Sequence, residues 1–307
     1  MLGSCQIFTP YAPRDAAPFG YLVMKGQHTS ADHRTTRIVI RPQTDYGVAD
    51  NLKDIWNSRE TAWSLALREI QIRYKQSVIG VAWAVMQPLI TTLIFTMIFG
   101  FLVKIPTDGV PYPVFVLSGL LFWQYFSKVL VESAGSLVRN EAIITKVFFP
   151  RLVLPLVPAL SSAVELGISL IMLLALMVFY GILPTPFVLC LPLLLFWAGL
   201  LAYGFGLMLS PINAIYRDVA IALPFFVQIG MYMTPVIYPV SFVPTNYQWI
   251  FLFNPVGTLL DTARAMLLGS PFPPALAFAI LAGWTVIALI LGFRTFRKLE
   301  PAIVDRI

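Results

Sequence analysis

Hydrophobic residues gather in six long blocks, and shorter polar segments separate these blocks along most of the chain. A helix needs about 20 apolar residues to cross about 30 Å of hydrocarbon, and tilting accommodates longer runs. Each block is long enough, so the pattern predicts an all-α integral membrane protein with six transmembrane helices. The predicted spans are 79–103, 113–131, 152–180, 187–210, 219–238 and 275–293.

The segment 51–78 has a different pattern, which predicts an amphipathic helix at the membrane interface. Its apolar face consists of Trp63, Ala66, Leu67, Ile70 and Tyr74. Its polar face consists of Ser64, Arg68, Gln71 and Lys75. A helix with one apolar and one cationic face lies in the plane of the lipid headgroups. We expect it to continue without a linker into the first span.

Residues 1–50 predict a polar, irregular amino-terminal extension in which only 34–48 could hold a short strand. The first twenty residues contain neither an apolar core nor a small-residue cleavage site, so we expect no cleavable signal peptide. The predicted organisation is therefore an extension (1–50), an interface helix (51–78) and a six-span domain (79–307).

The distribution of charge predicts the orientation. With a cytoplasmic amino terminus, the cytoplasmic pieces are 1–83, 128–151, 211–218 and 294–307. All 21 Lys and Arg residues except Lys104 and Arg264 then lie on the cytoplasmic side. Positive residues favour cytoplasmic loops, so both termini are expected in the cytoplasm. The net charge of +6 follows membrane sidedness in this way, and we expect no nucleic-acid partner.

Residues 239–274 are too apolar for an ordinary loop and are interrupted at Pro244, Pro255 and Gly269. The helical pieces between these residues are too short to span, which favours re-entrant or interfacial helices on the extracytoplasmic side. We call this segment the lid. Within it, Asp261 and Arg264 are three residues apart on a predicted helix and are expected to form an ion pair.

Composition and the absence of known motifs limit the chemical activities that this chain can have. The chain is 58% hydrophobic and only 12% charged, whereas soluble domains carry roughly 25% charged residues. It contains no P-loop, no H-E-x-x-H and no clustered catalytic side chains, and its two cysteines have no metal-like spacing. We therefore expect no bond chemistry and no metal site. Energy for uphill transport would come from a partner or an ion gradient.

Three intramembrane or near-membrane charges are candidates for function. Glu165 lies in the third span, where it either carries protons or pairs structurally within the bundle. Lys128 and Glu132, four residues apart, are expected to pair only with each other.

The cytoplasmic loop after the second span predicts one short amphipathic helix, Gly135–Val147. Its apolar residues need a cover, which is either a partner protein or the membrane face of the chain itself. A second charged site, Arg217 and Asp218, lies in the turn between spans four and five. Adjacent residues face apart on a helix, so these two cap the turn or contact partners separately.

Aromatic residues cluster in spans two and five. Either they belong to the interfacial belt and lipid-facing packing, or they line a pore on whose rings sugars stack. The candidates are Phe122, Trp123, Tyr125, Phe126, Phe225 and Tyr232.

Five segments together resemble the ABC-2-type permeases that export polysaccharides, most strongly the Wzm-type O-antigen permeases. The resemblance extends over 35–307. The segments are LALREIQIRYKQSVIGVAWAVMQPLITTLIFTMIFG, FFPRLVLPL, NAIYRDV, PVIYP and NPVGTLLDTARAMLLG. The resemblance implies a homodimer around a central channel in the bacterial inner membrane. It also implies two copies of a separate ATPase, which would bind ATP and Mg²⁺, and a lipid-linked polysaccharide as substrate.

The resemblance also implies residue roles. It assigns ATPase coupling to Val138, Arg139, Asn140, Glu141, Ile143, Lys146, Arg217 and Asp218. Contact with the headgroup of the lipid carrier falls to Arg68, Arg73 and Lys75. The extracytoplasmic gate falls to Tyr238, Asn254, Asp261 and Arg264. The aromatic candidates would line the channel. Alternatives are an exporter of capsule polymer, teichoic acid or small amphiphiles, and an ion-coupled secondary transporter.

Overall fold

The computed structural model describes residues 55–75, 82–144 and 150–304, which belong to the compact unit Asp45–Ile307. The amino-terminal extension and the junction at 76–81 lie outside the described residues. The described residues form helices and no strand. These are α2 (Arg59–Lys75), α3 (Ala82–Phe95), η1 (Thr96–Leu102), α4 (Tyr112–Ala134), α5 (Ser136–Arg139), α6 (Glu141–Ile144), η2 (Arg151–Leu156), α7 (Val157–Phe179), η3 (Pro186–Cys190), α8 (Leu191–Ile215), α9 (Asp218–Met233), η4 (Val240–Phe242), α10 (Thr245–Leu252), α11 (Pro255–Leu268) and α12 (Ala275–Val304).

Among the described residues, five helical segments are long and apolar enough to cross a membrane. They correspond to the first, second, third, fourth and sixth predicted spans. The fifth block forms α9, which is apolar but has only 16 residues. It ends early because Pro235 forces the preceding Thr234 into an extended conformation, with φ −99° and ψ 143°. The predicted fifth span is therefore shorter than its hydrophobic run.

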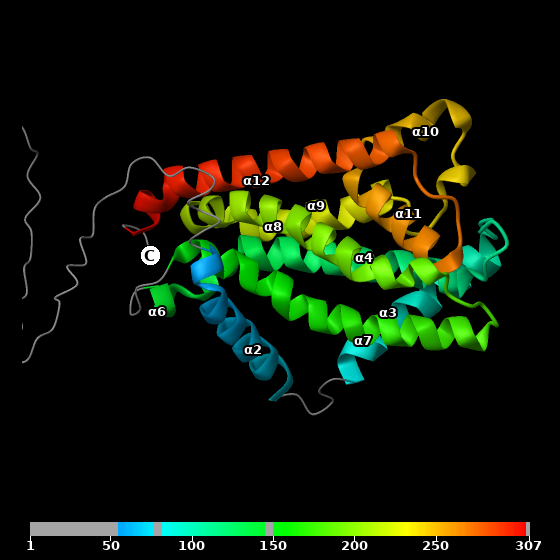
Figure 1. Cartoon of the computed structure of the whole chain (residues 1–307), viewed down its shortest axis with the longest axis horizontal. Helices are drawn as coiled ribbons and strands as arrows, with labels where there is room; N and C mark the ends of the chain where they lie inside the picture. Colours follow the sequence, from blue (N-terminus) through cyan, green and yellow to red (C-terminus); the bar gives the residue numbers. More distant parts are fainter. Residues whose placement is uncertain (1–54, 76–81, 145–149, 305–307) are drawn as a thin grey trace, which may run out of the picture. The chain divides into compact units, whose positions relative to one another are not determined.

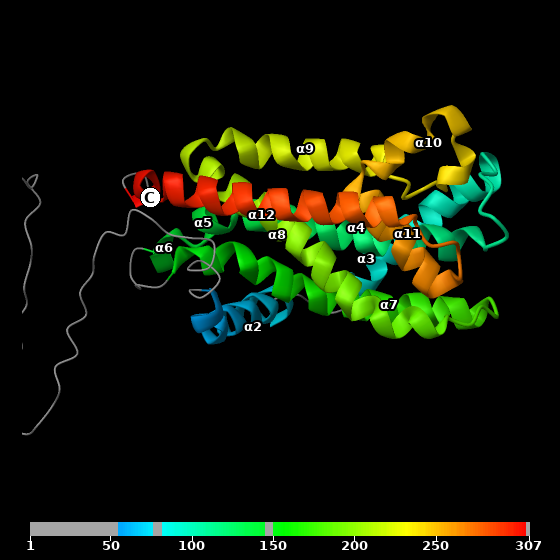
Figure 2. The same ribbon diagram turned by 45° about the horizontal axis from the view of Figure 1, so that its top comes forward.

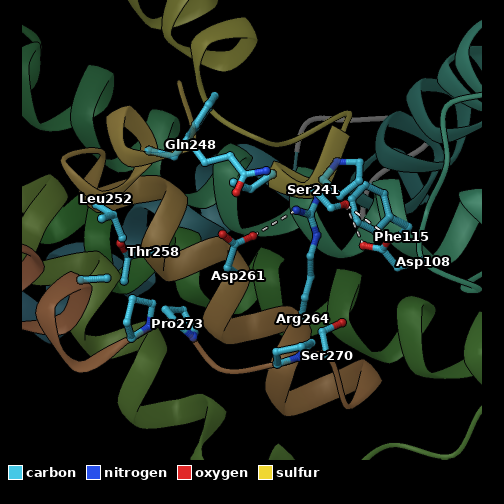
Figure 3. A pocket seen from close by; sticks show the side chains of 16 residues that line it. Asp108, Phe115, Ser241, Gln248, Leu252, Thr258, Asp261, Arg264, Ser270 and Pro273 are labelled. Carbon is cyan, nitrogen blue, oxygen red and sulfur yellow. Dashed lines mark hydrogen bonds and ion pairs between the residues drawn. The ribbon is translucent and has the colours of Figure 1, made fainter. Parts of the chain in front are cut away.

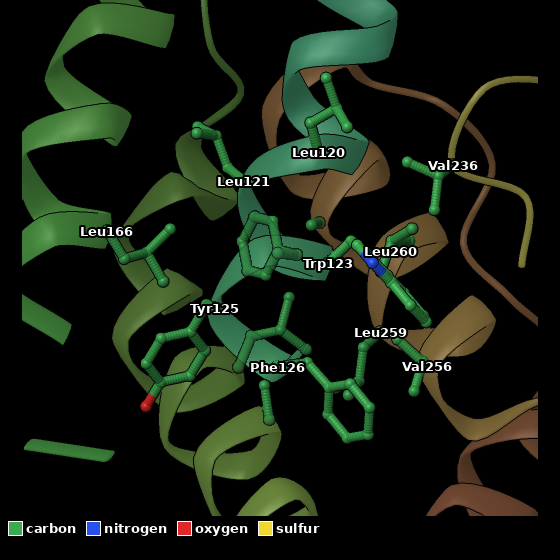
Figure 4. Close-up of a cluster of buried hydrophobic side chains, with 14 of the residues drawn as sticks. Leu120, Leu121, Trp123, Tyr125, Phe126, Leu166, Val236, Val256, Leu259 and Leu260 are labelled. Atoms are coloured by element: carbon green, nitrogen blue, oxygen red, sulfur yellow. The ribbon is translucent and has the colours of Figure 1, made fainter. Parts of the chain in front are cut away.

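The core is built around α4, which packs against α7, α8 and α11. Figures 1 and 2 show α4 running between these helices. In Figure 4, Trp123 and Phe126 of α4 meet Leu259 and Val256 of α11. Lipid tails are as apolar as leucine, so close packing and not exclusion from water holds such a core together.

The pair α8 and α12 packs most extensively, through a close crossing of backbones. A Cβ added to Gly292 would lie 2.6 Å from the carbonyl oxygen of Gly204, and one added to Gly204 would lie 3.0 Å from the backbone of Ala288. Glycine is required at this crossing because any larger side chain would separate the two helices.

The lid has the predicted breaks. Pro244 precedes α10, Pro255 is the first residue of α11, and Gly269 ends α11 with a left-handed φ of 75°. The two short helices lie at the opposite end of the molecule from α6 and the carboxyl end of α12 (Figures 1 and 2). The pattern of short helices is confirmed, whereas their re-entry into a membrane stays a prediction.

Candidate functional site

A cluster of five charged residues joins the interface helix α2 to the spans α4 and α7. Arg73 of α2 donates to Glu165 of α7, to Glu132 of α4 at 3.1 Å and to Glu69 at 3.4 Å. Lys128 of α4 donates to the second oxygen of Glu165. All five side chains are at most about one-third exposed. The cluster therefore fastens α2 to the bundle.

These contacts show the partners of the intramembrane charges. Glu165 is paired on both oxygens, as the structural interpretation expects. The prediction that Lys128 and Glu132 pair only with each other is wrong, because Lys128 turns to Glu165 and Glu132 to Arg73. Sequence reasoning missed the inward position of Glu69 and Arg73, although their spacing of four residues was a usable signal.

The inward face of α2 differs from the predicted apolar face. Ala62 and Ala66 are buried against the bundle, whereas Trp63 and Leu67 are exposed. The small alanines allow α2 to approach closely enough for Arg73 to reach α4 and α7. The exposed Trp63 and Leu67 leave an apolar surface, as expected of a helix that contacts lipid.

The cluster has three carboxylates against two cations, so it carries a formal charge of −1. Burial, and next the nearby Glu132, raise the pKa of Glu69 above its ordinary value. Arg73 is thus already neutralised by its neighbours. Arg68 and Lys75 are exposed and form no ion pair with the described residues. These two residues are therefore the cations of α2 that an anionic lipid headgroup would contact.

The predicted coupling helix is two short helices, α5 and α6, separated at Asn140. The side-chain amide of Asn140 donates to the carbonyl of Ser136 at 2.9 Å, and Arg139 donates to the carbonyl of Glu132. Leu137 is fully buried in the chain's own core, and Val138 and Ile143 are half-buried. Part of this segment is therefore covered by the protein itself, while Arg139 and Glu141 are exposed to solvent.

Two coupling candidates have other locations. Lys146 lies outside the described residues. Arg217 and Asp218 are both exposed at the start of α9, at the same end of the molecule as α6 (Figures 1 and 2). Asp218 is the first residue of α9, where a negative charge favours the helix dipole.

The gate candidates fix the lid to the bundle. The Asn254 side chain caps α11 by accepting from the backbone N–H of Val256 and Gly257, and its amide donates to the Thr234 hydroxyl at 3.0 Å. The Tyr238 hydroxyl donates to the carbonyl of Tyr232 at 3.1 Å. The contact of Asn254 with Thr234 joins the lid to the carboxyl end of α9, and the contact of Tyr238 with Tyr232 fixes the turn just before the lid.

The predicted pair of Asp261 and Arg264 is confirmed, with Nη1 of Arg264 3.4 Å from Oδ1 of Asp261. Arg264 is only 3% exposed and donates to the carbonyls of Pro235 and Val236, at 2.7 Å each. Its guanidinium also lies 3.8 Å from the centre of the Phe115 ring. Burial lowers the pKa of Arg264 to about 10, which is still well above neutral pH. Arg264 is the main polar link between α11 and the turn after α9.

A cavity of about 320 Å³, the lid pocket, opens beside this ion pair. Its polar lining includes Asp108, Ser241, Gln248, Asp261 and Arg264, together with apolar side chains of the lid. Figure 3 shows the Asp261–Arg264 pair and the contact of Ser241 with Asp108 in this lining. Sequence reasoning placed Asp261 and Arg264 in the lid but gave no signal for Asp108, which comes from the loop before α4.

The aromatic candidates separate into two groups. Phe122, Trp123, Tyr125 and Phe126 of α4 are buried within the chain's own core. Phe225 and Tyr232 of α9 are 63% and 53% exposed. Rings that line a channel must be open to its contents, so the channel prediction narrows to these two residues of α9.

Comparison with known proteins agrees with this architecture. The family model described as ABC-2 type transporter matches residues 60–268. The O-antigen export system permease protein RfbA of Klebsiella pneumoniae is 26% identical over 76% of this chain and 89% of its own length. The protein of the same name from Myxococcus xanthus is 26% identical over 83% of this chain and 98% of its own. The polysialic acid transport protein KpsM of Escherichia coli is 25% identical over 80% of this chain and 95% of its own. The family model spans the interface helix, the charge cluster and the lid, and the chain accordingly belongs to the ABC-2 type transporter membrane family.

Proposed function

We propose that the chain is the transmembrane subunit of a homodimeric ABC transporter that exports a lipid-linked, O-antigen-like polysaccharide across the inner membrane. One observation carries this proposal: the similarity to O-antigen and polysialic acid exporters covers at least three-quarters of this chain and most of each relative. An ATPase subunit, present in two copies, binds ATP and Mg²⁺ and supplies the energy.

The six spans of the proposed topology are α3 with η1, α4, α7 with η2, α8 with η3, α9 and α12. Both termini are cytoplasmic, as the distribution of Lys and Arg favours. The arrangement of the elements supports this topology, since α6, the start of α9 and the end of α12 share one end and the lid takes the other. The 16 residues of α9 span about 24 Å, so the turn after α9 lies within the membrane boundary.

The ATPase docks at the end that carries α5 and α6. Arg139 and Glu141 are exposed there, and Arg217 and Asp218 are exposed at the start of α9, at the same end of the molecule. Motion of the ATPase reaches the spans through α5, which follows α4 after the single residue Gly135.

The polymer passes between two protomers along the exposed face of α9, where Phe225 and Tyr232 contact its sugars. Its lipid headgroup approaches α2, where Arg68 and Lys75 remain open to a phosphate. The charge cluster holds α2 in place and does not itself bind the headgroup.

The test is disruption of this gene in its host, followed by detection of the polymer on the surface and inside the cell. We expect surface polymer to disappear and lipid-linked polymer to accumulate in the cytoplasm. Restoration should require both this chain and its ATPase. Normal surface polymer in the disrupted strain would refute the proposal.

A second experiment distinguishes an ATP-driven exporter from an ion-coupled transporter. Glu165→Gln removes a proton-carrying group and keeps one acceptor oxygen, which can serve Arg73 or Lys128. An ATP-driven exporter retains transport with this change, whereas a proton-coupled transporter loses it. The remaining alternative within the family is an exporter of small amphiphiles. Transport of a fluorescent amphiphile into membrane vesicles that contain this chain and its ATPase tests it.

A further inference from the structure

We propose that the lid pocket is a binding site for an uncharged, hydroxyl-rich sugar unit, and that it disfavours anionic groups. This inference rests on the proposed function, because it assigns the pocket to the exported polymer. The cavity volume of about 320 Å³ lies at the small end of the range for ligand pockets, roughly 300–1,000 Å³. The site is therefore large enough for a small part of a chain and not for a folded segment.

Three polar side chains of the lining offer open hydrogen-bond acceptors. Oδ1 of Asp261 faces Arg264, whereas its Oδ2 forms no hydrogen bond within the described part of the chain. The carboxylate of Asp108 accepts from the Ser241 hydroxyl at 3.0 Å and retains further lone pairs. The Gln248 amide donates to the carbonyl of Val243 at 2.8 Å through one N–H, which leaves its oxygen as an acceptor beside its second N–H. Such a lining suits a ligand that donates from several hydroxyl groups.

The one cation in the lining has both terminal nitrogens in use, whereas its Nε–H is buried without a partner among the described residues. Arg264 gives its two terminal nitrogens to the carbonyls of Pro235 and Val236 and to Asp261, and it stacks on Phe115. The lining residues include two carboxylates and one guanidinium, so the pocket has a formal charge of −1. A phosphate or carboxylate would meet this net negative charge with only neutral donors of the lining, such as the Ser270 hydroxyl, open to offset it, and its affinity would be low.

The apolar part of the lining complements the acceptors. Phe251, Leu252 and the Pro273–Pro274 pair line the pocket along with the polar groups. The apolar faces of a sugar ring pack on such surfaces while its hydroxyls reach outward to acceptors. The lining thus combines an apolar surface with hydrogen-bond acceptors. This combination distinguishes a neutral saccharide from a lipid tail and from an anion.

The experiment uses the purified complex of this chain with its ATPase in lipid nanodiscs. Maltotriose and chitotriose are neutral probes, trigalacturonate is an anionic probe of equal length, and saturation-transfer NMR measures their binding. We expect both neutral probes to bind and trigalacturonate not to bind. Gln248→Ala should weaken neutral binding roughly two- to tenfold, the effect of one lost hydrogen bond. Asn246→Ala, which removes an exposed amide of the same helix outside the lining, is the matched control.

A charge variant adds a readout that a change in folding would not produce. Asp108 has a positive φ of 51°, which asparagine tolerates, so Asp108→Asn retains the loop conformation and removes one negative charge. We expect trigalacturonate to begin to bind to this variant.

Three results would overturn the inference: equal binding of anionic and neutral probes to the unaltered complex, no change in Gln248→Ala or Asp108→Asn, or no binding of either neutral probe. If export in the host is normal in any of these cases, the inference fails while the proposed function stands.

Discussion

Two arginines of α2, five residues apart, have opposite surroundings. Arg73 faces the bundle and contacts three carboxylates from three helices, whereas Arg68 is exposed. The sequence does not distinguish them, because the partners of Arg73 on α4 and α7 are 59 and 92 residues away along the chain. The lipid-headgroup prediction grouped Arg73 with Arg68 and Lys75, and so it treated the two arginines as equivalent.

We expect Arg73→Ala to destabilise the protein and Arg68→Ala to leave its stability unchanged. Loss of Arg73 leaves Glu132 and Glu69 without a cation and Glu165 with only Lys128. An unpaired, partly buried charge costs about 1–3 kcal/mol. The measurement is the thermal unfolding midpoint of each purified variant in the same detergent. Equal midpoints for the two variants would contradict the fastening role of the cluster.

Asn254 is a second residue whose role came only from the structure. Its side chain caps α11 and also holds Thr234, so it stabilises the lid in two ways. Asn254→Ala should cost roughly 0.5–2 kcal/mol through the lost cap. Proteolysis of the lid in reconstituted protein is the measurement, with faster cleavage expected. Asn246→Ala, an exposed amide in α10, should show the same cleavage rate as the unaltered chain.

Among the elements, the ends of the lid helices were predictable and the length of α9 was not. Pro244, Pro255 and Gly269 act through local backbone constraints, which are visible in the sequence. The hydrophobic run 219–238 continues beyond Met233, so hydropathy alone extends the fifth span through Pro235. Hydropathy also does not reveal which aromatic rings face the core, because a ring in lipid and a ring in the core have the same composition.

The crossing of α8 and α12 gives a prediction with a matched control in the same helix. Gly292→Ala would place a methyl group against the Gly204 carbonyl oxygen, and such overpacking costs about 1–3 kcal/mol. Gly283→Ala adds its methyl group where no atom lies within 4 Å. We expect a lower thermal midpoint and reduced membrane levels for Gly292→Ala only. Comparable losses for both variants would show that the crossing is not tightly packed.

At the scale of the whole molecule, the two ends carry different elements. The short charged helices α5 and α6 lie at one end, and the lid with its pocket lies at the other. The charge distribution along the sequence predicted which segments share an end, because positive residues accumulate on one side of a membrane. It could not predict that the loop before α4 contributes Asp108 to the lid pocket. That contact depends on how distant segments pack.

The orientation is testable with single cysteines in a chain whose Cys5 and Cys190 are replaced by serine. Asn246→Cys in α10 and Arg217→Cys at the start of α9 are both at exposed positions. A membrane-impermeant maleimide should label Asn246→Cys in intact spheroplasts and label Arg217→Cys only after permeabilisation. The opposite pattern would reverse the proposed topology.

The helix α4 also has a mechanical consequence. Its first residue, Tyr112, donates to the carbonyl of Ile237 beside the lid, and its last turn leads through Gly135 into α5. Its 23 residues make a rod of about 34 Å with no proline in its interior beyond the first turn. A force applied to α4 at the α5 end would therefore displace the whole helix, including its end beside the lid. We expect the stroke of this transporter to be set by how far α4 can slide within its neighbours.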